Sequence, residues 1–238
     1  MNSSVSDIAV VLPAAGSGQR FGLDENKLFA RLGDATIWEV AARTLRSHPR
    51  VARVVMPVST ADRPRFETEF ADVTRELAVE VVEGGAERTD SVGSGLEAVG
   101  DDSAIRLVAI HDAARPLVPL RDLDEVFSRA DETGAAILAL PATATVKQTL
   151  DAGQSCKTLD RETIWLAQTP QVFHLDLLRR AYAKHRGRPA TDDADLVQRI
   201  GVNVALVAGS AENLKVTHPD DLAIAEAILE RRQRQIDD

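Results

Sequence analysis

A glycine-rich stretch near the N-terminus has the residue types of a phosphate-binding loop. The stretch 12–27, "LPAAGSGQRFGLDENK", contains three glycines and two basic residues, Arg20 and Lys27. Glycines allow backbone N–H groups to approach an anion closely. Arg20 offers a planar fork for phosphate oxygens, and Lys27 offers a movable point charge. The stretch therefore predicts a binding loop for a polyanion such as a nucleoside triphosphate.

The glycine spacing differs from the two common phosphate loops. Gly16, Gly18 and Gly22 are one residue too widely spaced for a dinucleotide fingerprint, and no acid ends the next strand to bind a ribose. No Gly-Lys pair occurs in the chain, which excludes a Walker A loop. By spacing alone, a structural turn after the first strand remains an alternative.

Two further motifs follow apolar runs. "GGAERTDSVGSGL" (84–96) begins with glycines on which a flat base could lie, and Ser91 follows in the first turn of an expected helix. "IHDAARP" (110–116) contains Asp112, whose carboxylate could hold Mg²⁺ or accept hydrogen bonds from hydroxyls. His111 is interpreted as a packed strand residue. A plain β-to-α turn and a helix cap are the alternatives for the two motifs.

Short apolar runs that alternate with amphipathic stretches predict the fold. The runs are expected to be strands, and they cover residues 7–14, 51–58, 78–85, 105–112 and 134–141. Helical patterns lie between them, at residues 36–48, 62–73, 88–100 and 121–133. Near-continuous apolar strands joined by helices predict a doubly wound α/β domain with a mostly parallel sheet. No linker divides the chain, so a single domain is expected over residues 1–238.

The alternation breaks between residues 142 and 166. Two short β-prone runs flank an Asp-Ala-Gly turn there, which predicts a β-hairpin arm inserted at about residues 142–160. The segment after the arm contains Arg161 and an expected turn at residues 169–171. A helix is expected at residues 191–201, with Thr191 as its N-cap. A strand over residues 202–209 is then expected to lead to Lys215.

The bulk composition limits the compartment and the partners. The formal net charge of −9 argues against a nucleic-acid-binding surface. A single cysteine, Cys156, excludes a disulfide within the chain and a cysteine-rich zinc site. The apolar run at the N-terminus is too short for a signal peptide or a membrane span. A soluble, cytoplasmic protein with no membrane partner is expected.

Several motifs occur together in one order along the chain. They are "PAAGSGQRFG" followed by Lys27, "GGAERTDSV", "HDAARP", "DRETIWLAQTPQ", "TDDA" and "ENLKVTHPDDL". From about residue 7 to residue 231, the chain resembles the 2-C-methyl-D-erythritol 4-phosphate cytidylyltransferases of the non-mevalonate isoprenoid pathway. The resemblance implies a Rossmann-like nucleotidyltransferase that uses Mg²⁺. It also implies that CTP and 2-C-methyl-D-erythritol 4-phosphate give 4-diphosphocytidyl-2-C-methyl-D-erythritol and pyrophosphate.

The resemblance also implies roles for individual residues. The implied nucleotide-binding positions are Pro13, Ala14, Ala15, Gly16, Gly85 and Ser91; the implied catalytic cations are Arg20, Lys27 and Lys215; the implied positions for the polyol phosphate are Asp112, Thr145, Arg161, Thr169 and Thr191. Members of the family often carry an acid where this chain has Ala86, so the backbone would read the base there. The family further implies a homodimer in which the arm reaches the partner's active site.

Three other functions remain open from the sequence. A ribitol-5-phosphate cytidylyltransferase shares these motifs and differs in the polyol. Another sugar nucleotidyltransferase would use a purine or uridine nucleotide. A non-catalytic nucleotide-binding module would have little need of three cations around the phosphates. The missing Ser-His-Asp set does not argue against catalysis, because a phosphate dianion is already a nucleophile.

Overall fold

The computed structural model describes residues 6–16, 26–185, 187 and 189–237. The central sheet of these residues has seven strands in the order β11-β7-β10-β6-β1-β4-β5. Their bounds are β1 Ile8–Val11, β4 Val51–Val58, β5 Val79–Glu83, β6 Leu107–Ile110, β7 Ala135–Pro141, β10 Trp165–His174 and β11 Ala205–Ala208. A small two-stranded sheet, β2 (Arg31–Leu32) and β3 (Ala35–Thr36), lies beside them.

The predicted mostly parallel sheet is confirmed. β1 pairs in parallel with β4 and β6, β4 with β5, and β11 with β7. β10 is antiparallel to both of its neighbours, β6 and β7. The carboxyl ends of β1, β5 and β6 therefore meet at one edge of the sheet, which is where ligands bind in folds of this class.

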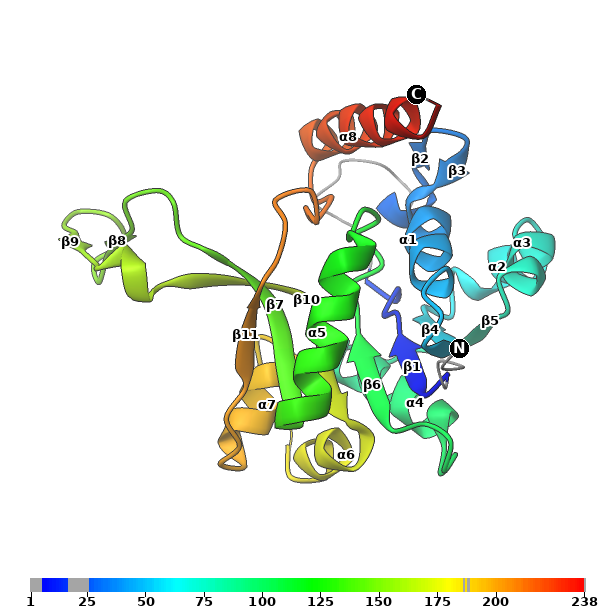
Figure 1. The fold of residues 1–238 in the computed structure, drawn as a ribbon, viewed down its shortest axis with the longest axis horizontal. Coiled ribbons are helices and arrows are strands. Elements are labelled where there is room, and N and C mark those ends of the chain that lie inside the picture. The colour runs from blue at the N-terminus through cyan, green and yellow to red at the C-terminus, as the bar shows by residue number, and fades with distance from the viewer. Residues whose placement is uncertain (1–5, 17–25, 186, 188, 238) are drawn as a thin grey trace.

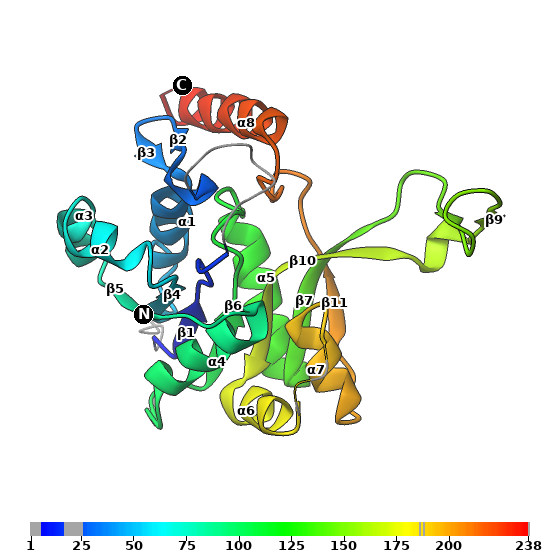
Figure 2. The ribbon, with the colours of Figure 1, turned by 180° about the vertical axis from the view of Figure 1, so that it is seen from behind.

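Helices cover both faces of the sheet (Figures 1 and 2). α1 (Ile37–Arg46) and α5 (Leu120–Thr133) pack on one face, and α4 (Arg88–Val99), α6 (Leu175–Ala183) and α7 (Asp193–Arg199) pack on the other. The remaining helices are α2 (Arg63–Glu67) and α3 (Ala71–Glu76), which lie next to β5, and α8 (Pro219–Asp237), which lies next to β2. Alternate residues of β1 enter two hydrophobic clusters. Ile8 and Val10 pack with α1 and α5, whereas Ala9 and Val11 pack with α4, α6 and α7. This burial on both faces explains the continuous apolar runs of the sequence.

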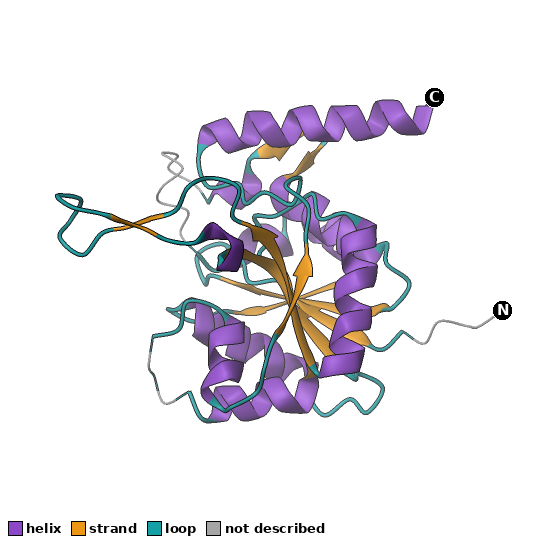
Figure 3. Ribbon diagram, turned by 60° about the vertical axis from the view of Figure 1, so that its left-hand side comes forward, coloured by secondary structure: helices purple, strands orange, loops and turns teal. Residues whose placement is uncertain are grey.

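The expected hairpin is present and projects from the body of the protein (Figure 3). Its tip is formed by two antiparallel strands of two residues each, β8 (Lys147–Gln148) and β9 (Lys157–Thr158). At the base of the arm, β7 and β10 pair with each other, beginning with Pro141 opposite Trp165, and both strands continue into the central sheet. The arm is therefore an extension of two core strands, which holds its base in place.

The helix expected over residues 62–73 is wrong as a single element. The structure has two short helices, α2 and α3, separated at Thr68, whose backbone leaves the helical region (φ −123°, ψ −79°). The Thr68 hydroxyl donates a hydrogen bond to the Pro64 carbonyl at 2.8 Å. Such local side-chain bonds compete with helix continuation.

The turn expected at residues 169–171 is also wrong, because these residues lie inside β10. The pairing of β10 with β7 shifts register between Ala167 and Gln171. Pro170, which has no N–H to donate, sits at this irregularity, where a strand tolerates proline. The N-cap of α7 is Asp192 and not Thr191, because the Asp192 carboxylate accepts from the Asp195 N–H.

None of the helices in the described part of the chain is long and apolar enough to cross a membrane.

Candidate functional site

A cleft of about 400 Å³ opens at the carboxyl ends of β1, β5 and β6. Nine residues predicted to take part in the site line it: Pro13, Ala14, Ala15, Gly16, Lys27, Gly85, Ser91, Asp112 and Lys215. The structure thus brings together four motifs that are spread over 203 positions of the chain, from 13 to 215. Arg20, the third predicted cation, lies outside the described residues.

The loop after β5 forms one wall of the cleft by a close approach of backbone. A Cβ atom on Gly84 would lie 2.7 Å from the Ala15 Cβ, and one on Gly85 would lie 2.2 Å from the Asp90 Cβ. Only glycine fits at such distances. The Gly85 N–H donates to the buried Ser91 hydroxyl at 3.1 Å, so Ser91 holds the glycine turn in place.

Lys27 begins a 3-10 helix, η2 (Lys27–Phe29), and does not lie in an open loop. Asn26 caps this helix, because its side-chain oxygen accepts from the Leu28 N–H at 3.1 Å. The Lys27 Nζ donates to the Val216 carbonyl at 2.7 Å. This contact joins the segment after the glycine loop to the segment that carries Lys215.

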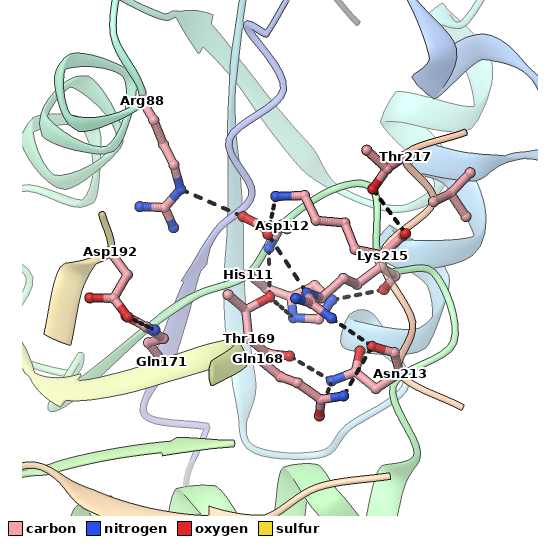
Figure 4. A network of polar contacts seen from close by, with 12 residues as sticks. Arg88, His111, Asp112, Gln168, Thr169, Gln171, Asp192, Asn213, Lys215 and Thr217 are labelled. Carbon is pink, nitrogen blue, oxygen red and sulfur yellow. Dashed lines mark hydrogen bonds and ion pairs between the residues drawn. The ribbon is translucent and has the colours of Figure 1, made fainter. Parts of the chain in front are cut away.

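Asp112 lies at the centre of a group of cations (Figure 4). Its carboxylate is 2.8 Å from the Lys215 Nζ, 3.6 Å from the Arg88 Nε and 3.7 Å from the Arg115 Nε. Burial alone would raise the pKa of Asp112, but Lys215 and Arg88 outweigh burial and hold it well below its usual range. Asp112 is therefore ionised throughout the physiological pH range.

Arg88 was missed in the sequence, although it stands within the quoted "GGAERTDSV" motif. It lines the cleft and joins Asp112 to Asp193, whose carboxylate is 2.8 Å from the Arg88 Nη2 and fully buried. Burial disfavours the charged guanidinium, but Asp193 and Asp112 outweigh it and raise the pKa of Arg88. A lone arginine has no sequence signal for such a partner, because Asp193 lies 105 positions further along the chain.

Thr169 supports the backbone of Asp112. The Asp112 N–H donates to the Thr169 hydroxyl at 3.0 Å, and this hydroxyl lies 3.2 Å from the His111 Nδ1. The His111 Nε2 lies 2.9 Å from the Arg115 carbonyl. All three contacts are satisfied when neutral His111 carries its proton on Nε2. Complete burial confirms that His111 is packed, but His111 follows β6 directly and does not lie within a strand.

This buried histidine predicts acid sensitivity. Burial is the largest influence on His111 and lowers its pKa from 6.5 to about 4. The unfolded chain therefore binds more protons than the folded one between these values, so the free energy of unfolding falls as pH drops from 6.5 to 4. The loss is about 3 kcal/mol. Urea unfolding at several pH values should show a shallower fall in His111→Asn. An equal fall of the free energy of unfolding in wild type and His111→Asn would contradict this prediction. His218→Gln, which changes an exposed histidine, serves as the control and should match wild type.

Four predicted substrate residues do not line the cleft: Thr169, which lies behind Asp112, and Thr145, Arg161 and Thr191. Thr145 is on the arm and Arg161 follows directly after it, where the Arg161 Nη1 donates to the Thr143 carbonyl at 2.7 Å. Arg161 begins a second 3-10 helix, η3 (Arg161–Thr163). Thr191 is exposed beside Asp192, whose carboxylate accepts from the Gln171 side chain at 2.9 Å. Their roles in binding stay predictions.

The cleft suits a metal that arrives with its ligand. Among the described residues, no three histidine, cysteine or carboxylate side chains form a metal-binding group. Two carboxylate residues, Asp112 and Glu87, line the cleft. Mg²⁺ is commonly held by one or two carboxylates together with substrate phosphates and water. The donor set of the described residues therefore fits Mg²⁺ that arrives with a phosphate ligand.

Comparison with known proteins gives the family of this chain. The family model described as 2-C-methyl-D-erythritol 4-phosphate cytidylyltransferase matches residues 8–231. The chain is similar to the cytidylyltransferase of that name from Rhodopirellula baltica, with 48% identity over 238 residues, 96% of this chain and 97% of the relative. A relative of the same name from Bacillus velezensis is 39% identical over 226 residues, with 94% and 96% covered.

Solved structures agree with the sequence comparison. The crystal structure of 2-C-methyl-D-erythritol 4-phosphate cytidylyltransferase from Thermus thermophilus has a TM-score of 0.76 and 36% identity, and the match covers 93% of this chain and 98% of that one. A crystal structure of 4-diphosphocytidyl-2C-methyl-D-erythritol synthase has a TM-score of 0.78 and 31% identity, with 94% and 98% covered. Together with the cleft and its motifs, these matches show that the chain belongs to the 2-C-methyl-D-erythritol 4-phosphate cytidylyltransferase family.

Proposed function

We propose that this enzyme transfers the cytidylyl group of CTP to 2-C-methyl-D-erythritol 4-phosphate. The products are 4-diphosphocytidyl-2-C-methyl-D-erythritol and pyrophosphate. The observation that carries the proposal is the convergence of Lys27, Lys215 and Asp112 on one cleft whose other wall is the glycine turn at Gly85. A wall of exposed backbone suits a flat base, and two lysines suit a triphosphate.

In the proposed complex, the nucleotide lies in the cleft with its base and sugar in one part and its triphosphate in another. The base and sugar lie against Ala14, Ala15 and Gly16 on one side and against the Gly85 turn held by Ser91 on the other. The triphosphate lies toward Lys27 and Lys215, with Arg20 as a third cation. The Lys215 ammonium pairs with Asp112, so phosphates that bind Lys215 would compete with this carboxylate.

The chemistry is an in-line displacement at the α-phosphorus. An oxygen of the polyol phosphate forms a bond to this phosphorus, and the bond to the bridging oxygen of the β-phosphate breaks, so pyrophosphate leaves with the electron pair. The nucleophile is an anion and needs no general base. Bringing two anions together and stabilising the crowded phosphorus are the main barriers, and lysines held in fixed positions lower both.

Mg²⁺ would be held by the triphosphate, with the Asp112 and Glu87 carboxylates as the candidate protein ligands. When bound, it supplies charge neutralisation between the phosphate groups. Lys27 and Lys215 then orient the phosphates, and the hydrogen bond from the Asp112 N–H to the Thr169 hydroxyl keeps the Asp112 carboxylate at the cleft.

The enzyme is proposed to act as a homodimer in the cytoplasm, with the arm of one copy against the cleft of the other. Large apolar side chains are exposed on the arm and at its base: Leu150, Trp165 and Leu166. Leu150 is 92% exposed. Burial of such side chains against a second copy would be favourable. The arrangement also accounts for Thr145 and Arg161, which lie outside the cleft of their own chain.

Pyrophosphate release tests the proposed function directly. With CTP, Mg²⁺ and 2-C-methyl-D-erythritol 4-phosphate all present, release is expected, and omission of any one should abolish it. Parallel reactions replace CTP with ATP, GTP or UTP and replace the polyol phosphate with D-ribitol 5-phosphate. Equal or faster turnover with D-ribitol 5-phosphate would assign the enzyme to the alternative polyol. No turnover with any pair would favour a non-catalytic module.

A mixed dimer tests the action of the arm in the partner's site. One subunit carries Lys27→Ala and the other carries Thr145→Ala, so a site built from two chains keeps one intact copy per dimer. Heterodimers purified with two different affinity tags should regain about half of the wild-type rate, whereas each homodimer stays impaired. Heterodimers that are no more active than the homodimers would show that each site is built from one chain.

A further inference from the structure

One segment of the chain positions both lysines of the cleft. The Lys215 loop, residues 209–217, leads from β11 to α8 and carries Lys215 at the end nearer to α8. The same loop supplies the Val216 carbonyl that accepts from the Lys27 Nζ at 2.7 Å. Its only backbone bond to the "HDAARP" motif among those described is from the Val216 N–H to the Ala114 carbonyl at 2.8 Å. The course of this loop therefore decides where two cations stand.

Asn213 holds the middle of the loop from inside the protein (Figure 4). It is completely buried, although it is a polar residue in a loop. Its Nδ2 donates to the Thr169 carbonyl at 2.7 Å. The backbone carbonyl of Asn213 accepts a hydrogen bond from the Arg115 Nη1 at 2.7 Å. Asn213 thus joins the Lys215 loop to the two segments that place Asp112, namely β10 and the segment after β6.

Gln168 completes the attachment. It is 5% exposed, its Nε2 donates to the Ser210 carbonyl at 3.0 Å, and its Oε1 lies 3.4 Å from the Asn213 Nδ2. A Cβ atom on Gly209 would lie 2.4 Å from the same Oε1. The loop therefore passes close against the Gln168 amide, and buried amide groups are costly to leave unpaired.

We propose that Asn213 is a positioning residue for catalysis, with Gln168 as its partner. It does not line the cleft; it acts by fixing the Lys215 loop, so that the ammonium groups of Lys215 and Lys27 stand where the triphosphate binds. The proposal rests on the proposed function, in which Lys215 acts on the phosphates. A displacement of about 1 Å at a positioned group can cost about 10²-fold in rate.

The test separates positioning from stability with a double-mutant cycle. The variants are Asn213→Ala, Lys215→Ala and the two together, and the measurements are kcat and the Kd for CTP. Asn213→Ala is expected to lower kcat by about 10²-fold with a nearly unchanged Kd, because the wall at the Gly85 turn is intact. In the Lys215→Ala background, Asn213→Ala should lower kcat clearly less than it does in wild type, since one of the two ammonium groups that it positions is gone.

Controls keep the result interpretable. Leu178→Ala, in a fully buried position on α6 at the far end of the sheet, should lower the thermal midpoint without a comparable loss of kcat. Should Asn213→Ala not fold, Gln168→Met removes two hydrogen-bonding groups at similar length and enters the same cycle. The proposal would be overturned if the fold-losses in kcat of the two single variants multiplied in the double variant. A normal kcat in folded Asn213→Ala or Gln168→Met would also overturn it. A normal kcat in Lys215→Ala alone would overturn the proposed role of Lys215 as well.

Discussion

Lys27→Met is expected to lower kcat by at least about 10²-fold, the scale of one lost electrostatic contact in a transition state. Methionine keeps the length and most of the packing of lysine and removes the charge. The structure places the Lys27 Nζ against the Val216 carbonyl at the cleft, within the part of the site assigned to phosphates. The loss should appear in single-turnover rates at saturating CTP and polyol phosphate.

A matched variant controls for the loss of a lysine. Lys184→Met changes an exposed residue at the end of α6 and should keep the wild-type rate. Thermal unfolding of both variants should show near-normal stability, because Lys27 is partly exposed. A near-normal kcat in folded Lys27→Met would remove Lys27 from the catalytic group.

Arg161→Ala should weaken the binding of the polyol phosphate and leave the affinity for CTP nearly unchanged. The planar guanidinium suits a terminal phosphate as a bidentate partner. Lost charge-assisted hydrogen bonds of about 1.5–3 kcal/mol correspond to roughly 10- to 150-fold in kcat/KM for the polyol phosphate. In the structure, Arg161 is exposed directly after the arm and donates to the Thr143 carbonyl; in the proposed homodimer, this effect would act on the partner's cleft.

Two measurements divide the site between its substrates. Steady-state kinetics with varied polyol phosphate should show the fall in kcat/KM of Arg161→Ala. Arg161→Lys should recover part of it, because the charge returns without the planar fork. Calorimetric titration of CTP into Arg161→Ala should match wild type. Lys157→Ala on the same arm serves as a control and should behave as wild type. A collapse of CTP affinity in Arg161→Ala would place Arg161 on the nucleotide side.

Features that depend on nearby residues were predictable. Buried strands show as continuous apolar runs, and the predicted run 51–58 matches β4 (Val51–Val58). A carboxylate or a glycine at the carboxyl end of such a run lies at the ligand edge of a parallel sheet, so Gly85 and Asp112 were each predicted as site residues. The structure brings both into the cleft. The order of the motifs also identified the family.

Features that depend on distant partners were not predictable. β10 contains Pro170 and polar residues, which favour a turn locally, yet its pairing with β6 and β7 makes it a central strand. Arg88 and Asn213 look like surface residues in the sequence. Their importance depends on Asp193 and Thr169, which chain folding brings within hydrogen-bonding distance.

The sequence by itself determined which residue types are available for phosphate chemistry, where the buried strands lie and which family the motifs resemble. The tertiary structure alone decided that Asp112 is surrounded by Lys215, Arg88 and Arg115. It also decided that Thr145 and Arg161 lie away from their own chain's cleft. The physical reason is range: apolar periodicity and turn propensity act over a few residues, whereas ion pairs and strand order form between segments far apart in the chain.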